Sequence, residues 1–97
     1  MENSRLAFAL GMAQKAGKAA SGDFAVRSAL KSGRVKLLVI AVDTAPNTKK
    51  DLYYMAQQFR VEAVELGTKA GLGSAIGKAQ RTAVALTDVN FANMLKK

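Results

Sequence analysis

One face of the helix predicted over residues 23–31 combines the side chains that could contact a nucleic acid. At about 100° per residue, an aromatic, two basic and one hydroxyl side chain fall together on this face: Phe24, Arg27, Ser28 and Lys31. The opposite face is an apolar stripe suited to a core: Val26, Ala29 and Leu30. A ring can stack on an unpaired base, and cations and hydroxyls can contact phosphates. The alternative for Phe24 is that its ring folds back under the preceding helix.

Two predicted loops carry further polar and basic side chains. Lys49 and Lys50 stand at the start of a predicted helix, where exposed N–H groups favour an anion. Lys78, Gln80 and Arg81 precede the last predicted strand and could meet phosphates or base edges. A solvated loop is the alternative explanation for each group.

Catalytic chemistry has little support in the residue types present. The chain has no histidine and no cysteine, so Ser-His pairs, Cys-His pairs and thiolate ligands are excluded. The acidic residues are scattered, and each is explained as a cap, a strand end or a surface residue. The glycine-rich stretch fails as a Walker loop, because Leu72 stands where the first glycine belongs and Ala79 where a hydroxyl is needed. We therefore predict no catalytic residue, no metal site and no cofactor.

The charge balance agrees with a nucleic-acid partner. The 97 residues include 15 Lys and Arg against 7 Asp and Glu, a net charge of +8, with a sequence pI near 10.1. Most of the excess lies in the first half of the chain. Solubility alone is the competing explanation for such an excess. Hydrophobic residues make up 49% of the chain, which supplies a core for one domain, residues 1–97, without disulfides.

Targeting and membrane signals are absent from the sequence. No apolar run approaches the roughly 20 residues of a membrane span, and the N-terminus lacks a signal-peptide pattern. The sequence therefore predicts a cytoplasmic monomer that does not contact membranes.

The first half of the chain predicts helices and strands in alternation. Apolar residues at helical spacing indicate a helix over residues 4–15, with Asn3 or Ser4 as its N-cap. A short strand over residues 18–20 follows, and then the helix already described, capped by Ser21 or Asp23 and ended by Gly33. Residues 37–42 form a continuous apolar run rich in branched side chains, which is typical of a central strand buried on both faces.

The second half continues the alternation. Apolar spacing predicts a third helix through Phe59, a strand over residues 61–66, and a loop with a short helix between Gly67 and Gly77. A strand over residues 82–87 and a final helix capped by Asp88 complete the chain. This order predicts a three-layer α/β/α sandwich around a small, largely parallel or mixed sheet. Ligands of such sheets sit at loops beyond strand ends, here residues 21–27, 43–50 and 77–81.

An ordered set of short motifs resembles a known family. The motifs are Lys15-Ala16-Gly17-Lys18, Ser21-Gly22, Ser32-Gly33-Arg34-Val35-Lys36-Leu37, Ala41-Val42-Asp43, Asn47-Thr48-Lys49-Lys50, Leu72-Gly73, Gly77-Lys78 and Arg81. They resemble the kink-turn-binding ribosomal protein superfamily of large-subunit proteins seven-Ae and thirty-e, most closely its bacterial YlxQ-like members. The resemblance implies an α/β/α fold and a cytoplasmic, non-enzymatic protein that binds kinked RNA in or near the ribosome.

The resemblance also assigns residues. Gly22 matches the glycine that begins the RNA-contacting helix, and Asp43 matches the acid that ends the central strand. The family usually has polar residues where this sequence has Phe24, Ala25 and Ser28, so the groups expected to read a kink-turn are replaced. The complete predicted RNA-binding set is Lys18, Ser21, Gly22, Asp23, Phe24, Arg27, Ser28, Lys31, Asp43, Lys49, Lys50, Lys78, Gln80 and Arg81.

The replaced residues support a second hypothesis. An aromatic in place of a polar group can anchor a protein contact as well as a base. The alternative function is therefore a protein-interaction module of the translation or transcription apparatus that has lost kink-turn recognition.

Overall fold

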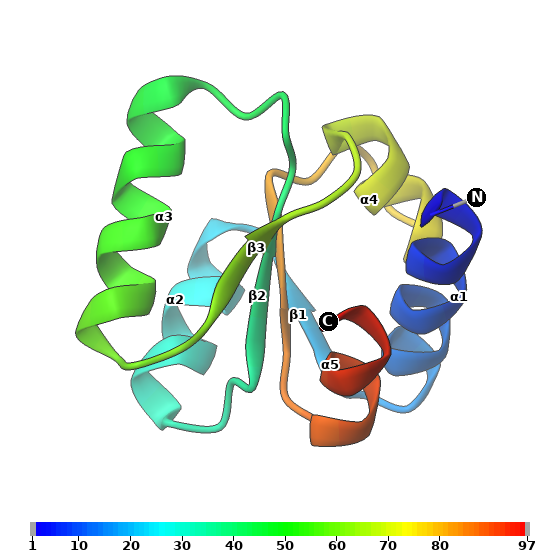
Figure 1. Ribbon diagram of the computed structural model, residues 1–97, viewed down its shortest axis with the longest axis horizontal. Helices are drawn as coiled ribbons and strands as arrows, with labels where there is room; N and C mark the ends of the chain where they lie inside the picture. Colours follow the sequence, from blue (N-terminus) through cyan, green and yellow to red (C-terminus); the bar gives the residue numbers. More distant parts are fainter. Residues whose placement is uncertain (1, 97) are drawn as a thin grey trace.

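The chain folds into three layers around one small sheet (Figure 1). The computed structural model describes residues 2–96. Along the chain the elements are α1 (Glu2–Lys15), β1 (Ala19–Ser21), α2 (Asp23–Ser32), β2 (Leu37–Ile40), α3 (Pro46–Gln58), β3 (Ala63–Glu65), α4 (Lys69–Ala75), β4 (Ala83–Leu86) and α5 (Val89–Leu95). Helices α2 and α3 cover one face of the sheet, and α1, α4 and α5 cover the other. The predicted α/β/α sandwich is confirmed.

The sheet is mixed, with its last strand in the interior. The strand order is β1-β4-β2-β3, in which β4 runs antiparallel to both β1 and β2, while β2 and β3 are parallel. The sequence predicted a largely parallel or a mixed sheet, and the structure has the mixed sheet. Every residue of β2 and of β4 is buried, which confirms a central strand in the apolar run. The strand ends at Ile40, however, two residues short of the predicted 37–42, and Val42 is 48% exposed.

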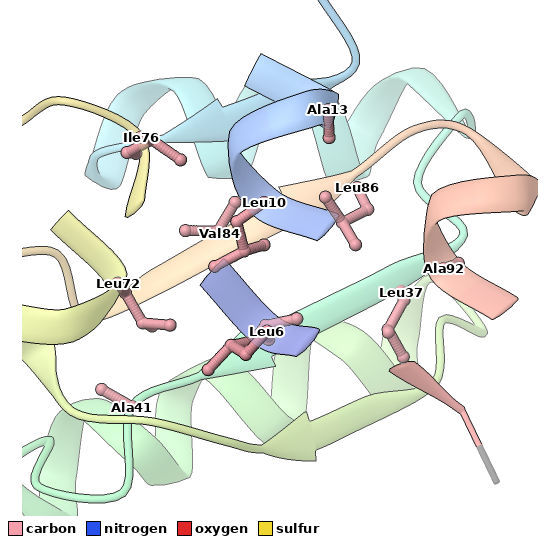
Figure 2. Close-up of a cluster of buried hydrophobic side chains, with 11 residues drawn as sticks. Leu6, Leu10, Ala13, Leu37, Ala41, Leu72, Ile76, Val84, Leu86 and Ala92 are labelled. Carbon is pink, nitrogen blue, oxygen red and sulfur yellow. The ribbon is translucent and has the colours of Figure 1, made fainter. Parts of the chain in front are cut away.

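Alternate residues of the central strands β2 and β4 belong to two hydrophobic clusters on opposite faces of the sheet. Leu37, Val39, Val84 and Leu86 face the layer of α1, α4 and α5, where they meet Leu6, Leu10 and Leu72 among others (Figure 2). Leu38, Ile40 and Ala83 face the other way, against Val26 and Leu30 of α2 and Leu52 and Ala56 of α3. The apolar stripe predicted for residues 23–31 is thus the core face of α2.

The starts of two helices differ from the prediction. Helix α1 begins at Glu2, so Asn3 and Ser4 lie inside the helix and not at its N-cap. The N-cap of α2 is Gly22, with no side-chain hydrogen bond, so neither Ser21 nor Asp23 caps this helix. Gly22 has φ 87° and ψ 151°, a conformation that a residue with a Cβ rarely adopts. The sharp turn at glycine, and not a polar side chain, sets where α2 begins.

Other helix ends follow the predicted signals. Gly33 ends α2 in the left-handed conformation with φ 78°. The Asp88 carboxylate accepts hydrogen bonds from the N–H groups of Asn90 and Phe91, so the predicted cap of the last helix is confirmed. Thr68 caps α4 in the same way through the Gly71 N–H, which the sequence analysis did not predict.

The glycine-rich segment serves close packing. A Cβ at Gly73 would clash with the backbone carbonyl of Ala79, so only glycine lets the α4–β4 loop cross the helix here. The same loop is held by a 2.8 Å hydrogen bond from the Lys78 N–H to the Gly73 carbonyl. Close packing of the loop against α4 therefore explains the glycine at position 73.

No helix within residues 2–96 has the length and apolar character needed to cross a membrane.

Candidate functional site

The three loops predicted to hold a ligand meet at one edge of the sheet. Because β4 runs antiparallel to both neighbours, the pairs Ser21↔Val84 and Ile40↔Ala83 put the ends of β1 and β2 beside the start of β4. The β3–α4 connection arrives there too, through a 2.8 Å hydrogen bond from the Val42 N–H to the Gly67 carbonyl. We call residues 21–27, 43–50, 66–69 and 77–82 the loop edge; it is the upper end of the molecule in Figure 1.

Two of the predicted contact residues join these loops to one another. The Arg81 side chain donates from Nε to Ser21 Oγ at 3.2 Å, and its backbone N–H donates to the Lys69 carbonyl at 3.1 Å. The Asp43 carboxylate accepts from the Lys69 N–H at 2.8 Å. Asp43 and Arg81 therefore hold the shape of the loop edge, whatever else they contact.

Phe24 projects into solvent from the first turn of α2. The residue is 85% exposed, the largest value among the exposed large hydrophobic residues of the described chain. The alternative that its ring folds back under α1 is therefore wrong. An exposed ring at a helix start, beside loops with free polar groups, is available for stacking.

Arg27 does not stand beside Phe24 as the helical spacing suggested. Its Nε lies 3.0 Å from the Asp23 carboxylate, and its Nη1 donates to Met55 Sδ of α3 at 3.2 Å. The guanidinium therefore turns toward α3, along a cavity of about 120 Å³ between the starts of α2 and α3 that Thr48 and Asp51 also line. The outer face of this turn is left to Phe24 and Ser28.

Lys49 is held inside the protein's own hydrogen-bond network. Its Nζ lies 3.0 Å from Glu65 Oε1 of β3 and donates to the Val42 carbonyl at 3.1 Å, while the Tyr53 hydroxyl donates to Glu65 Oε2 at 2.8 Å. The hydrogen bonds from Lys49 and then Tyr53 lower the pKa of Glu65. Burial, followed by the bond to Glu65, raises the pKa of Tyr53. The charge of Lys49 is thus compensated within the protein.

The remaining predicted residues divide between two places. Lys50, Lys78 and Gln80 are exposed at the loop edge, and within residues 2–96 their side chains form no ion pair. Lys18 and Lys31 lie elsewhere. Lys18 sits before β1, where its carbonyl accepts from the Thr87 N–H at the far end of β4, and Lys31 is in the last turn of α2. The structure does not bring these two lysines to the loop edge.

Sequence reasoning missed the contribution of the segment that follows β3. Lys69 joins Asp43 to Arg81 through its backbone, and the Thr44 hydroxyl donates to the Thr82 carbonyl at 3.3 Å. The glycines between residues 67 and 77 predicted a loop and a short helix, but no contact between this segment and the other loops. Backbone bridges of this kind have no signature in residue type, so only the fold reveals them.

Comparison with known proteins gives one family over nearly the whole chain. The model of the ribosomal protein L7Ae/L30e/S12e/Gadd45 family matches residues 4–96. The RNA-binding protein YlxQ of Bacillus subtilis is 36% identical over 86 residues, covering 89% of this chain and 86% of that protein. The RNA-binding protein YlxQ of Enterococcus faecium is 28% identical over 88 residues, covering 91% and 84%.

A eukaryotic ribosomal protein and a solved structure are similar as well. Large ribosomal subunit protein eL30 of Neurospora crassa is 32% identical over 88 residues, covering 89% of this chain and 81% of that protein. The structure of a protein with unknown function from Bacillus halodurans C superposes with a TM-score of 0.82 at 30% identity, covering 90% of this chain and 88% of that one.

Proposed function

This chain belongs to the ribosomal protein L7Ae/L30e/S12e/Gadd45 family, as a YlxQ-like member, and we propose that it binds structured RNA at the loop edge and catalyses no reaction. The names of the YlxQ proteins and of eL30 support an RNA partner. A kinked RNA helix is the proposed target, and the cytoplasm and the translation apparatus are the proposed setting.

The exposed Phe24 ring among converging loops is the observation that carries this proposal. Exposing a large aromatic ring to water is unfavourable, so a ring that is 85% exposed at the start of α2 favours a partner that covers it. An unpaired nucleobase offers a flat face of matching size, and such a stack is worth about 1 to 3 kcal/mol in other proteins.

The other loop-edge residues supply charge and position. Lys50 and Lys78 carry uncompensated charges for phosphates, and Gln80 offers an amide that can donate and accept. The start of α3 adds backbone N–H groups that favour an anion. The ion pair with Asp23 holds Arg27, which must exchange that partner to contact a phosphate.

The test compares a hairpin RNA that contains a kink-turn with a straight duplex of equal length. Phe24→Ala should weaken binding to the kinked RNA by about tenfold or more, the loss expected for one base stack. Tyr54→Ala is the matched control, because Tyr54 is also a largely exposed aromatic, 67%, but lies on α3 outside the loop edge. Equal affinity of wild type and Phe24→Ala would remove the ring from the RNA interface.

The salt dependence of binding tests the charged groups. Replacing both lysines in a Lys50→Gln/Lys78→Gln variant should reduce the slope of log K against log salt by about 1 to 2, because each phosphate contact contributes close to one unit. An unchanged slope would exclude both lysines from the interface.

The protein-interaction module remains the second candidate, because the same exposed ring can anchor a protein contact. Capture from lysate with and without nuclease separates the two functions. Partners that stay bound after nuclease treatment, and that Phe24→Ala releases, would favour the protein contact over RNA.

A further inference from the structure

The end of the molecule opposite the loop edge carries a second, separate group of cations. Its five members are all exposed, and within residues 2–96 none of their side chains forms an ion pair or a hydrogen bond. We call this group the basic end: Lys15, Lys18, Lys31, Arg34 and Lys36.

Main-chain contacts bring these residues together. Lys15 is the last residue of α1. The Lys18 N–H donates to the carbonyl of Ala13 in the last turn of the same helix. The Thr87 N–H donates to the Lys18 carbonyl at 2.9 Å, and the Lys36 N–H donates to the Leu86 carbonyl at 2.7 Å. Lys18 and Lys36 therefore flank the last residues of β4. The C-terminal ends of α1 and α2 reach the same, lower end of Figure 1.

A groove of about 340 Å³ opens between α2 and β1, beside two of these cations. Lys18 and Arg34 line it together with small residues, Ala19 and Ala29 among them, and it extends along α2 as far as Ala25 of the loop edge. Small side chains let a partner's backbone approach closely. Ser28 and Ser32 of α2 also line this groove, and the Ser32 hydroxyl donates to the Ala29 carbonyl at 2.6 Å.

The backbone of β1 adds donors and acceptors at the edge of the sheet. Because Lys18 pairs with Thr87 and β1 is an outer strand, the antiparallel alternation turns the Ala19 N–H and carbonyl away from β4. An outward N–H can donate to a phosphate oxygen, and an outward carbonyl can accept from a ribose 2′-hydroxyl.

Two acidic residues lie near this end, and neither forms an ion pair with its five cations in the described chain. Glu62 is paired with Lys96 at 3.4 Å, and the Asp88 carboxylate caps α5. Five exposed cations, two of which line a groove with serine residues and an outward backbone amide, fit a polyanion with regularly spaced charges.

We propose that the basic end binds the sugar–phosphate backbone of an RNA strand, separate from the RNA at the loop edge, so that one protein molecule bridges two RNA segments. Only the bridging rests on the function proposed above. Binding of a strand at the basic end does not require that the loop edge also bind RNA.

Two variants that remove equal charge from opposite ends test this proposal. Lys18→Gln/Arg34→Gln alters the basic end, and Lys50→Gln/Lys78→Gln alters the loop edge. The probes are a fluorescent oligouridine of about 12 nucleotides, within the usual range of single-strand site sizes, and the kink-turn hairpin. All four substituted residues are exposed, so both variants should fold as wild type does.

The basic-end variant should bind oligouridine about tenfold more weakly than wild type, with the salt slope reduced by about 1 to 2. The loop-edge variant should bind oligouridine within about twofold of wild type, since its substitutions lie outside this contact. Equal weakening by the two variants would show a general charge effect and overturn the proposal.

A two-colour measurement tests the bridging. Energy transfer between labelled hairpin and labelled oligouridine should appear with wild type and disappear with the basic-end variant, which still binds the hairpin. Competition between the two RNAs for one site would overturn the bridging. If the hairpin fails to bind while oligouridine binding still depends on Lys18 and Arg34, the proposed loop-edge function fails and the basic end stands. Binding of polyglutamate in place of oligouridine would assign the basic end to an acidic protein.

Discussion

The loop edge and the basic end use their cations in different ways. At the loop edge, Arg27 is paired with Asp23, Lys49 with Glu65, and Arg81 bonds to Ser21. At the basic end, all five cations are exposed without such partners in the described chain. Paired charges fix a shape, while unpaired charges supply affinity that does not depend on sequence. Lys50 and Lys78 are the exposed cations of the loop edge without an ion pair in the described chain, so the loop edge combines shape with some charge, whereas the basic end offers mainly charge.

Helix α2 runs from one end to the other, so weakening its core contact should affect both. Leu30→Ala removes a side chain that is 0% exposed and packed against β2, which should lower the free energy of unfolding by about 3 kcal/mol. Denaturant unfolding measures the loss. Phe24→Ala on the same helix is the control and should change stability by no more than about 0.5 kcal/mol, because its ring is in solvent. Similar losses for both variants would mean that the ring is packed.

Gly73→Ala should damage the loop edge and leave the basic end intact. The added Cβ meets the Ala79 carbonyl, a backbone atom that cannot turn aside, so we expect a loss of about 2 kcal/mol. Ser74→Ala, an exposed neighbour in α4, is the control. In the folded Gly73→Ala variant, the affinity for the kink-turn hairpin should fall more than the affinity for oligouridine. A larger loss of affinity for oligouridine than for the hairpin would contradict the assignment of the two RNAs to opposite ends.

A matched pair of helix caps offers a smaller test. Thr68→Ala removes the α4 cap at the loop edge, and Asp88→Ala removes the α5 cap near the basic end; each should cost about 1 kcal/mol. Only Asp88→Ala also removes a negative charge near the basic end, so this variant should bind oligouridine more tightly than wild type at low salt. Thermal unfolding and binding, measured on both variants, separate these effects. Equal binding by both would indicate that RNA does not reach this end.

The smallest expected effect concerns pH at the loop edge. Lys49 and Tyr53 hold the pKa of Glu65 below its ordinary value of 4.5, so their contacts add stability at neutral pH that is lost as pH falls through the lowered pKa. Glu65→Gln should therefore lose less stability than wild type between neutral pH and about pH 3. Denaturant midpoints across this range provide the measurement. Parallel curves for the two proteins would contradict this account of the Lys49 contact.

Most of the fold was predictable because the apolar patterns were strong. Residues 37–42 gave the central strand, and spacing on α2 separated the core stripe of Val26 and Leu30 from its exposed face. Helix ends marked by Gly33 and Asp88 were also correct. The start of α2 was not, because the conformation of Gly22 decided it and local polar residues only looked like caps.

The site was predictable in part. Segments 21–27, 43–50 and 77–81 were expected at strand ends, and the antiparallel placement of β4 does bring them together. Lys18 and Lys31 lie apart from them because Lys18 precedes β1 and Lys31 is in the last turn of α2, so the lengths of these two elements already imply the separation. The turn of Arg27 toward Met55, by contrast, depends on how α3 packs against α2, which helical spacing does not encode.

The interior position of β4 has a consequence for how the protein is made. Strand β4 separates β1 from β2 and pairs with both, although Ser21 and Val84 are far apart along the chain. Closing so long a loop carries an entropic cost that slows folding, and during synthesis the sheet stays open until β4 has left the ribosome. Both proposed RNA surfaces include contacts with the residues that flank β4, Arg81 and Thr87. A nascent chain should therefore gain both surfaces late and in the same step.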